Sequence, residues 1–477
     1  MSTPWPTTPP TARDRATYAD AEPRSFWLSA LPPREPEPSL HETTEADLCI
    51  IGGGYTGLWA ALQAKSDDPD RDVVLVEADT IGGAATGRNG GFCIGSLTHG
   101  LENGLARFSD ELRLLERFGR ENLSELVNDV QRYGIDCDLE LTGEFTPAIA
   151  GYQIEELRES GRLHERYGYD VEFFPDAASV QAEVASPLFQ AGLWVKDAGG
   201  VLDPAKLAQG LLRAAQRAGV RIHEGTRATA LQEAGPAVSV QTEQSGEIRA
   251  RRVLLATNAS PPLLRAIRRY IVPIYDYALV TEPLSEERLR SIGWRRRQGL
   301  GDASNQFHYY RLTAANRILW GGFEAVYRFG GPVEARLDDD EATFARLAQN
   351  FLTAFPQLDG IRFTHRWGGA IDTCSRFSVF FGTALGGRVS YAVGYTGLGV
   401  AATRWGARVA LDLMDGRQTE ATQTRYVRSK PVPFPPEPLR TAVIQLTRNR
   451  LAAADRRDGR RGLWLGALDR LGLGFNS

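Results

Sequence analysis

The sequence contains few residues of several kinds, and each shortage excludes a class of protein. Only 4 cysteines and 6 histidines occur among 477 residues, without metal-ligand spacing or a disulfide framework. We therefore expect no metal site, and the scattered cysteines favour a reducing, cytoplasmic compartment. No run of about 18 apolar residues is present, so we expect no membrane span.

The charge balance and the N-terminal segment exclude two further classes. The formal net charge of −4 argues against a nucleic-acid partner, and the basic runs at 295–297 and 456–461 are expected on solvated surface. Residues 1–44 are rich in proline and lack the continuous apolar core of a signal peptide. We expect an extended or disordered arm there, with residues 26–28 against the body of the protein.

Residues 46–65 place an apolar strand before a glycine-rich turn that opens a helix. Gly52, Gly54 and Gly57 satisfy the pattern G-x-G-x-x-G, in which the glycines permit a tight turn, close backbone approach to a pyrophosphate and helix–strand packing. The helix N-terminus offers free N–H groups to the phosphates. Glu77 follows Gly52 by twenty-five positions, at the end of the next strand, where a carboxylate accepts hydrogen bonds from ribose hydroxyls. The unit predicts a dinucleotide site, and the acid argues against NADP.

Strand–helix alternation is interrupted twice along the chain, which indicates a discontinuous domain. We predict an α/β fold in which a Rossmann-like domain carries an inserted α+β domain built on a mostly antiparallel sheet. The boundaries are 1–44 for the arm; 45–100, 193–260 and 366–426 for the dinucleotide domain; 101–192 and 261–365 for the inserted domain; and 427–477 for a C-terminal strap.

Three further segments indicate a family. The stretches IGGAATGRNGG (81–91), ATNA (256–259) and GYTGLGV (394–400) resemble the D-amino-acid-oxidase (DAO) superfamily of FAD-dependent oxidoreductases. That group includes sarcosine oxidases, glycine oxidases and gamma-glutamylputrescine oxidoreductases, and the last are most similar because they share the arm, the ATGRNGG-type loop and the ATNA strand end. The resemblance spans most of residues 25–420 and implies that the dinucleotide is FAD and that the inserted domain binds substrate.

The resemblance also implies which residues contact FAD. Arg88 is expected to pair with phosphate or to lie beside the flavin ring, and a surface arginine is the alternative. The helix after Gly399 is expected to direct its N-terminus at the negative charge of reduced flavin. Leu398 stands where many members have histidine, and its contact is expected through backbone. The complete expected set is Gly52, Gly54, Tyr55, Thr56, Gly57, Glu77, Gly83, Thr86, Gly87, Arg88, Asn89, Gly90, Gly91, Ala228, Ala256, Thr257, Gly394, Thr396, Gly397, Leu398, Gly399 and Val400.

The chemistry implied by the family is oxidation at a carbon bonded to nitrogen. Hydride leaves the carbon of a neutral amine or amino acid, and water hydrolyses the resulting imine to an aldehyde or keto product. The partners are therefore a small-molecule amine and O2 or another electron acceptor, with no assignment of the oligomeric state. Cys374 lies beyond the place, near Gly368, of the cysteine that sarcosine oxidases link to FAD, so we expect non-covalent FAD. Leu319 stands where those oxidases carry an oxygen-promoting lysine, which leaves a dehydrogenase as the alternative.

The strand FHYYRL (307–312) is the first candidate for the substrate wall. Alternation places Tyr309 and Arg311 on one face and His308 and Tyr310 on the other. By similarity to sarcosine oxidases, Tyr310 is a substrate-facing tyrosine, whereas Arg311 suits a carboxylate clamp, and a regular strand directs only one of them inward. Trp367 is expected near the flavin. Tyr275, Tyr277 and Trp320 either line the same pocket or pack in the core.

Two other classes of function share parts of this pattern. A flavin monooxygenase using NAD(P)H also has G-x-G-x-x-G, but its usual GD motif precedes a helix, whereas Gly301-Asp302 precedes a strand-like stretch. A non-catalytic flavoprotein subunit would use the arm and the C-terminal strap as docking surfaces. A whole substrate domain favours catalysis over the second alternative.

Overall fold

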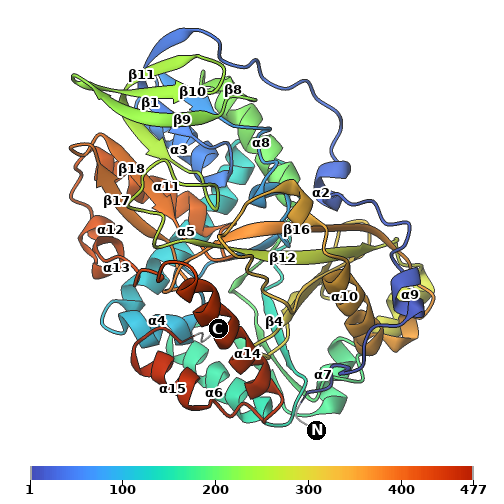
Figure 1. Cartoon of the computed structure of the whole chain (residues 1–477). Helices are drawn as coiled ribbons and strands as arrows, with labels where there is room; N and C mark the ends of the chain where they lie inside the picture. Colours follow the sequence, from blue (N-terminus) through green and yellow to red (C-terminus); the bar gives the residue numbers. More distant parts are fainter. Residues whose placement is uncertain (1–2, 475–477) are drawn as a thin grey trace.

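The computed structural model describes residues 3–474, which form two eight-stranded sheets and the helices around them (Figure 1). The first sheet has the order β17–β18–β11–β1–β2–β8, and the hairpin β9–β10 is attached to β11. Its strands are β1 (Thr43–Ile51), β2 (Val73–Val76), β8 (Arg221–His223), β9 (Ala228–Ala234), β10 (Ala237–Thr242), β11 (Glu247–Leu255), β17 (Phe380–Ala384) and β18 (Val389–Val393). The pairs β18–β11, β11–β1, β1–β2 and β2–β8 are parallel.

The central strands of the first sheet are buried on both faces. Leu48 and Ile50 pack under helices, whereas Cys49 and Ile51 pack toward the hairpin β9–β10. This two-sided burial explains why β1 ends in a continuous apolar run and not in an alternating pattern. The helices that share the Leu48 side are α3 (Tyr55–Asp67), α5 (Leu112–Arg132), α8 (Pro204–Arg217) and α11 (Ala402–Met414). Helix α5, which the predicted boundary at 101 placed in the inserted domain, thus belongs to this core.

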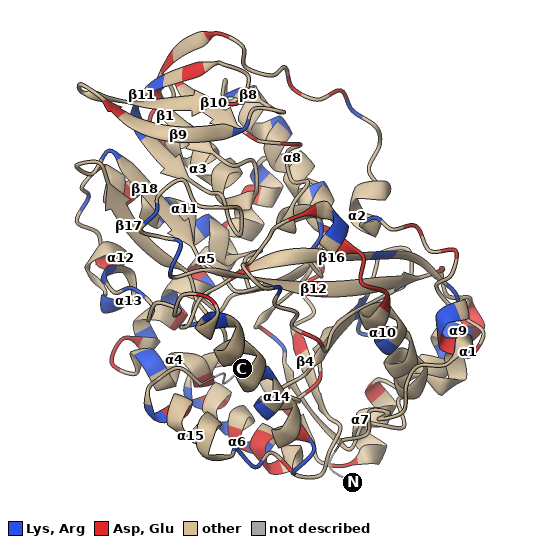
Figure 2. Ribbon diagram, viewed as in Figure 1, with Lys and Arg blue, Asp and Glu red and all other residues tan. Residues whose placement is uncertain are grey.

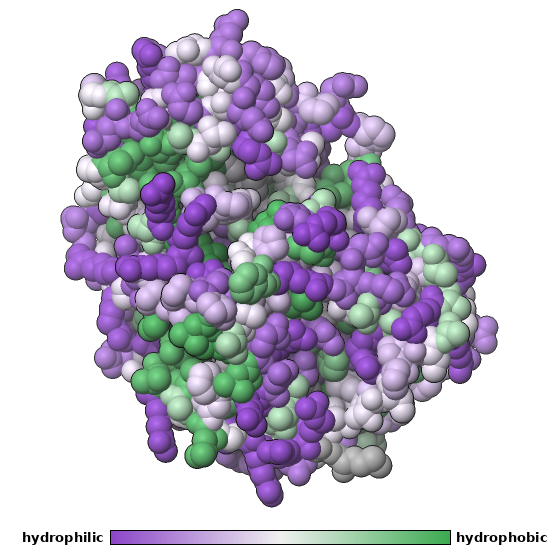
Figure 3. Space-filling view, viewed as in Figure 1, coloured by the Kyte–Doolittle hydropathy of each residue, from purple (hydrophilic) through white to green (hydrophobic). Residues whose placement is uncertain are grey.

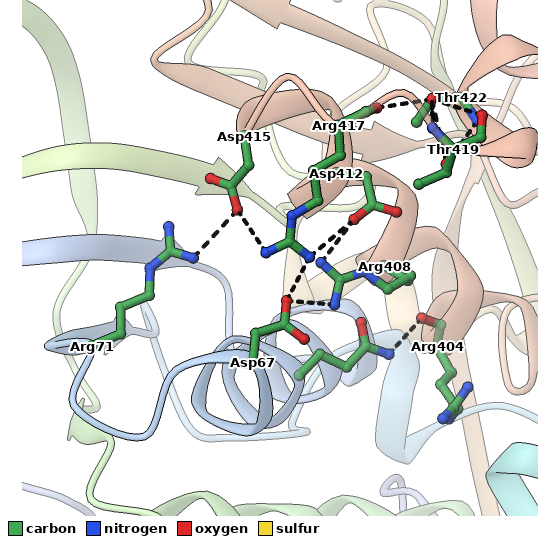
Figure 4. Close-up of polar contacts among 10 residues, drawn as sticks. Asp67, Arg71, Arg404, Arg408, Asp412, Asp415, Arg417, Thr419 and Thr422 are labelled. Carbon is green, nitrogen blue, oxygen red and sulfur yellow. Dashed lines mark hydrogen bonds and ion pairs between the residues drawn. The ribbon is translucent and has the colours of Figure 1, made fainter.

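A network of ion pairs ties the ends of α3 and α11 together (Figure 4). Asp67 Oδ2 lies 2.8 Å from Nη1 of Arg408 and 2.9 Å from Nη1 of Arg417. Asp412, which is buried, lies 2.9 Å from Nη2 of Arg408. These two helices follow the two glycine loops of the predicted cofactor site. The network therefore fixes the orientation of the two helices relative to each other.

The second sheet has the order β16–β12–β15–β14–β13–β4–β6–β5, and only the pair β13–β4 is parallel. Its strands are β4 (Glu144–Ala148), β5 (Val171–Phe174), β6 (Ala191–Val195), β12 (Val272–Thr281), β13 (Gly299–Gly301), β14 (His308–Leu312), β15 (Ile318–Gly322) and β16 (Phe363–Thr373). A separate pair joins β3 (Phe92–Ile94) to β7 (Gly199–Val201). The prediction of an α/β domain with a mostly antiparallel second sheet is confirmed.

Two predicted boundaries need correction. Strand β16 pairs with β12 from Phe363 to Thr373, so the residues after 366 remain in the second sheet. Strand β6 ends at Val195 and pairs with β4 and β5, so residue 193 also belongs to the second sheet. Which strands pair depends on residues that are distant in sequence, so the pairing cannot be predicted from local composition.

The N-terminal arm is ordered over its described residues and crosses both sheets. It contains α1 (Ala12–Ala16) and α2 (Phe26–Ser29). Trp27 is 2% exposed, and its Nε1 donates to the carbonyl of Asn89 over 2.9 Å, which confirms that residues 26–28 lie against the body. Arg34 and the buried Glu224 form an ion pair further along the arm. The arm therefore braces the loop 85–91 from outside.

The C-terminal strap forms a layer of helices over the second domain, coloured orange to red in Figure 1. Figure 3 shows apolar residues gathered over these helices, and Leu439, Leu463 and Leu471 are all more than half exposed. Figure 2 shows acidic and basic residues interspersed over the molecule. Residues 1–2 of the predicted arm and 475–477 of the predicted strap lie outside the described residues.

The remaining helices are α4 (Leu101–Phe108), α6 (Gln153–Arg166), α7 (Ala177–Glu183), α9 (Glu286–Ile292), α10 (Glu341–Ala354), α12 (Glu420–Gln423), α13 (Arg425–Arg428), α14 (Leu439–Asp455) and α15 (Leu463–Arg470), with short 3₁₀ turns at Ala85–Gly87, Ala335–Asp338 and Pro356–Leu358. No helix within residues 3–474 is long and apolar enough to cross a membrane.

Candidate cofactor and substrate site

One cavity of about 1610 Å³ lies between the two sheets. Its walls include the residues that follow β1, β2, β11 and β18, which is the edge where ligands of open parallel sheets bind. Its opposite wall comes from β12, β14 and β16 of the second sheet. Its volume exceeds the roughly 1,000 Å³ of a large drug-sized pocket, so a dinucleotide and a second molecule have room.

The first glycine loop shapes the cavity where β1 meets α3. Gly52 has φ 115°, and a Cβ on it would lie 2.3 Å from the carbonyl oxygen of Ala256. A Cβ on Gly57 would lie 1.9 Å from the carbonyl oxygen of Gly52, so the helix packs directly on the turn. The cap residue of α3, Gly54, offers no side-chain acceptor, the Thr86 hydroxyl accepts from the N–H of Tyr55, and Gly54, Tyr55 and Thr56 line the cavity. The remaining N–H groups of the first turn therefore suit a pyrophosphate.

Glu77 lies at the carboxyl end of β2 and lines the same part of the cavity. Its Oε2 accepts from the N–H of Gly53 over 2.7 Å, and its Oε1 accepts from the N–H of Asp79 over 2.9 Å. Burial raises the pKa of Glu77, and these backbone N–H groups partly offset that effect. Two backbone N–H groups thus fix the carboxylate of Glu77. Each of its oxygens keeps a second lone pair, which can accept a hydrogen bond from a ribose hydroxyl.

The loop 81–91 runs between the first sheet and the second domain. Thr86 Oγ1 accepts from the N–H of Tyr55 over 3.2 Å, which joins this loop to the start of α3. Arg88 donates from Nε to the carbonyl of Gly83 over 2.9 Å and forms an ion pair with Asp338. Arg88 thus spans the cavity wall between the domains and is not a free surface arginine.

Trp367 closes the wall beside Arg88. Its indole is 4% exposed, lines the cavity and donates from Nε1 to the carbonyl of Arg88 over 2.8 Å. Tyr275 and Tyr277 also line the cavity, whereas Trp320 is buried in the core of the second sheet. This arrangement places one predicted tryptophan at the cavity and leaves the other to packing.

The second glycine loop joins β18 to α11. Gly394 and Gly397 have φ 85° and 88°, and Thr396 has φ 54°. The buried carboxylate of Asp372 accepts from the N–H of Gly394 over 2.5 Å and holds the loop against β16. Burial raises the pKa of Asp372 to about 7. The loop and the N-terminus of α11 therefore meet the cavity as the resemblance implies, at Thr396, Gly397, Leu398, Gly399 and Val400.

Tyr309 and Asp276 form a hydrogen-bonded pair in the cavity wall that was not predicted from the sequence. The hydroxyl of Tyr309 on β14 donates to Oδ2 of Asp276 on β12 over 2.7 Å, and both residues line the cavity. Burial raises the pKa of Asp276 to about 6, although the Tyr309 hydroxyl and the N–H of Tyr277 favour its ionised form. A buried carboxylate with this pKa can accept a proton near neutral pH.

The other side chains of β14 correct the sequence prediction. Tyr310 is 1% exposed, and its ring centroid lies 4.7 Å from that of Trp320 in the core. Arg311 is equally buried and donates to the carbonyl of Leu202 over 2.6 Å. Neither residue lines the cavity, so the expectation that one of them contacts substrate is wrong. Tyr309 on the same strand is the side chain that reaches it.

Most predicted cofactor residues line the cavity, and a few support it from behind. Those at the cavity are Gly52, Gly54, Tyr55, Thr56, Glu77, Thr86, Arg88, Asn89, Gly90, Ala228, Ala256, Thr257, Thr396, Gly397, Leu398, Gly399 and Val400. Those behind it, which corrects their expected contact, are Gly57, Gly83, Gly87, Gly91 and Gly394. Their role is close packing: a Cβ on Gly91, for example, would lie 2.2 Å from the carbonyl oxygen of Leu202.

Comparison with known proteins defines the family. The family model DAO, "FAD dependent oxidoreductase", matches residues 47–413. Gamma-glutamylputrescine oxidoreductase of Escherichia coli (strain K12) is 32% identical over 396 residues, which cover 82% of this chain and 89% of the relative. The probable oxidoreductase OrdL of Haemophilus influenzae is 28% identical over 411 residues, covering 84% and 88% respectively.

Solved structures agree on the fold. Glycine oxidase from Geobacillus kaustophilus superposes with a TM-score of 0.63 at 17% identity, covering 79% of this chain and 96% of that one. L-proline dehydrogenase from P. horikoshii gives a TM-score of 0.63 at 18% identity, with coverages of 81% and 96%. The chain belongs to the DAO family of FAD-dependent oxidoreductases. The predicted family, fold class and cofactor are therefore confirmed.

The shape and the hydrogen-bonding groups of the cavity wall fit FAD. A Cβ on Gly54 would lie 2.9 Å from Thr86 Oγ1, so the approach to the open N-terminus of α3 suits glycine. Glu77 and Ala228 of the hairpin β9–β10 also line the cavity. The second glycine loop lines the same cavity. The N-terminus of α3 would hold the pyrophosphate, Glu77 and Ala228 the adenosine part, and the second glycine loop the flavin.

Proposed function

We propose that this protein oxidises a C–N bond of a small amine or amino acid, with FAD bound non-covalently. When bound, FAD supplies the two-electron oxidant that takes hydride from the carbon next to nitrogen. Water then hydrolyses the imine product to an aldehyde or keto compound. The relatives support an amine or amino-acid substrate, since the names of several include gamma-glutamylputrescine, glycine and L-proline.

The pair Tyr309–Asp276 is the observation that carries the proposal. Hydride leaves only from an amine that has lost its extra proton, so a proton acceptor beside the nitrogen favours the reactive form. Asp276 is such an acceptor in the cavity wall, and the Tyr309 hydroxyl that donates to it orients its carboxylate. The pair also offers a negative charge that attracts a cationic amine into the cavity.

The surroundings of Cys374 support non-covalent FAD. This thiol is fully buried, does not line the cavity and donates to the carbonyls of Ser378 and Gly394 over 3.2 and 3.4 Å. Burial raises the pKa of Cys374, which disfavours the nucleophilic thiolate. A thiol so placed does not present its sulfur to a ligand in the cavity.

The electron acceptor is O2 or another oxidant. Leu319, at the position where the resemblance implies an oxygen-promoting lysine, is fully buried beside Trp27 and Trp367 and does not line the cavity. The absence of a cation at that position supports transfer to an acceptor other than O2. The GD motif of flavin monooxygenases is followed by a helix, whereas Gly301-Asp302 is followed by strand β14. Asp302 accepts from the N–H groups of His308 and Ser304, so this pair does not support the monooxygenase alternative.

The test is anaerobic bleaching of the purified yellow protein. The panel contains gamma-glutamyl amines, primary amines, N-methyl amino acids and free amino acids, with NADPH as a control. We expect one amine class to bleach the flavin, and slow recolouring in air would identify a dehydrogenase. Bleaching by NADPH alone would overturn the proposal in favour of a monooxygenase. Retention of flavin in the protein after acid precipitation would overturn non-covalent binding.

A further inference from the structure

A second region of the cavity is acidic. We call it the acidic lobe and define it by Glu102 of α4, Glu116 of α5, Glu144 of β4, and Ser160 and His164 of α6, all of which line the cavity. The cavity-lining residues between 92 and 198 include no lysine or arginine. The five residues of the acidic lobe therefore place three carboxylates beside one imidazole.

One carboxylate of the lobe, Glu144, has no hydrogen-bond or ion-pair partner among residues 3–474, and a second, Glu116, has one oxygen without a partner. Glu116 is 4% exposed; its Oε2 accepts from the Tyr169 hydroxyl over 2.5 Å, but its Oε1 has no hydrogen-bond partner. The side chain of Glu144 makes no hydrogen bond or ion pair to any residue from 3 to 474. Glu102 accepts from the Ser160 hydroxyl over 2.6 Å. Glu144, half-buried and without a donor in the cavity wall, and the two acids beside it make the lobe suited to a ligand that donates hydrogen bonds and carries positive charge.

Arg120 favours the ionised form of Glu116, but it does not line the cavity. Arg120 lies 3.9 Å from the ring centroid of Tyr169 and donates to the carbonyls of Tyr167 and Gly168 over 2.6 and 3.1 Å. Burial raises the pKa of both Glu116 and Glu144. His164 directs Nδ1 to the carbonyl of Ser160 over 2.9 Å. Arg120 and His164 offset part of the negative charge of the three carboxylates, and the rest is expected to be balanced by a ligand in the cavity.

An apolar section separates the acidic lobe from Tyr309 and Asp276. The ring of Phe92 contacts that of Tyr309, with centroids 5.9 Å apart. Phe92 packs on the cluster formed by Ile94, Leu157, Leu193, Val195 and Ala198, and Leu398 of the second glycine loop packs on the same cluster. Val195 pairs with Glu144 across β6 and β4. The cavity therefore presents a carboxylate, then aliphatic walls, then a group of carboxylates.

We propose that the acidic lobe binds the second ammonium group of a diamine or polyamine whose reacting nitrogen lies at Tyr309 and Asp276. This proposal rests on the proposed function and names the substrate class of that site. The alkyl spacer of such a molecule matches the aliphatic walls. Its distal ammonium supplies N–H donors to Glu144, which has none, and positive charge to Glu102 and Glu116, each of which accepts from one hydroxyl. An organic cation is preferred to a metal ion, since the described residues contain no group of three or more His, Cys, Asp or Glu arranged to hold one.

The test compares diamines with monoamines on the holoenzyme. Anaerobic stopped-flow reduction of the flavin gives an apparent Kd and a limiting rate for α,ω-diaminoalkanes and for primary alkylamines of equal length. We expect the best diamine to bind about tenfold more tightly than the matched monoamine, as one buried charge-assisted contact provides. Equal Kd values for the two series would overturn the inference.

Two variants and a control locate the effect. Glu144→Gln and Glu116→Gln each keep the shape of the side chain, and we expect each to bring the monoamine-to-diamine Kd ratio down from about ten toward one. Glu155→Gln is the control: Glu155 lies on α6, is exposed and pairs with Arg158 over 3.0 Å outside the cavity. An unchanged ratio in both lobe variants, with normal flavin content and melting temperature, would also overturn the inference.

The design separates this inference from the proposed function. If no amine bleaches the flavin, the proposed function fails, and calorimetric titration of the same holoenzyme with diamines still tests the lobe. Diamine binding that disappears in Glu144→Gln would then support a cation site, and its absence would overturn it. If amines bleach the flavin but show no preference for a second ammonium, only the inference fails.

Discussion

The hydroxyl of Tyr309 donates to the carboxylate of Asp276 across the intervening strand β15, over 2.7 Å. The ring passes over Gly321, where a Cβ would lie 2.5 Å from Tyr309 Cζ. On its other side a Cβ on Gly90 would lie 2.8 Å from Tyr309 Cε2. Two glycines from different domains thus leave the space that this tyrosine occupies. Tyr309 and Asp276 therefore lie where the loop 81–91 meets the second sheet.

Replacing Tyr309 tests whether this side chain acts in the reaction. We expect Tyr309→Phe to lower kcat/KM by about 10- to 100-fold, because Asp276 loses its orienting donor while the aromatic wall remains. Tyr310→Phe, on the same strand but in the core, is the matched control and is expected to change kcat/KM less than about twofold. Steady-state kinetics with the best amine check both. Equal losses in the two variants would contradict the placement of β14.

The pH dependence of activity reports on Asp276. Its pKa is about 6, and only the ionised form accepts a proton, so kcat/KM is expected to rise with pH through about 6. Asp276→Asn removes this group and is expected to abolish that limb while lowering the plateau. A limb near the pKa of the free amine is expected to remain in both proteins. A limb at pH 6 that persists in the variant would assign it to another residue.

The first glycine loop is tested by flavin content. Gly54→Leu is expected to yield protein without FAD, because a side chain there collides with Thr86 beside the open N-terminus of α3. Gly466→Leu is the control, since no atom lies within 4 Å of a Cβ at that helical position. Flavin absorbance per mole of purified, folded protein is the measurement. A fully loaded Gly54→Leu would contradict the assignment of the loop.

Asp372 predicts an unusual dependence of stability on pH. Its ordinary pKa is 3.8, and burial raises it to about 7 in the folded protein, so the unfolded chain releases its proton first as pH rises. This group therefore lowers stability progressively between about pH 4 and 7, by up to about 4 kcal/mol. Asp372→Asn keeps an acceptor for the N–H of Gly394 and removes the charge. Its melting temperature is expected to exceed that of the parent at pH 8 and to approach it at pH 4, as followed by thermal unfolding; a constant difference would contradict the shift.

The strand, turn and helix around Gly52, and the acid at Glu77, were predictable from sequence. They lie within one continuous segment, and steric and hydrogen-bonding demands on such a turn leave few residue choices. The alternation along β14 was also predicted correctly, with Tyr309 and Arg311 on one face. The face that meets the cavity was not predicted, because it depends on how β14 sits between β13 and β15.

The tertiary structure alone decided the remaining features of the site. Strand β16 pairs with β12, although some ninety residues separate them in the chain, and this pairing brings Trp367 and Asp372 to the cavity wall. The acidic lobe collects Glu102, Glu116 and Glu144 from three separate elements. The periodicity of apolar residues predicts which residues of a helix or strand are buried, whereas contacts between distant elements depend on the packing of the whole chain. The sequence by itself thus determined the cofactor, and the packing of the two sheets determined which side chains face the cavity.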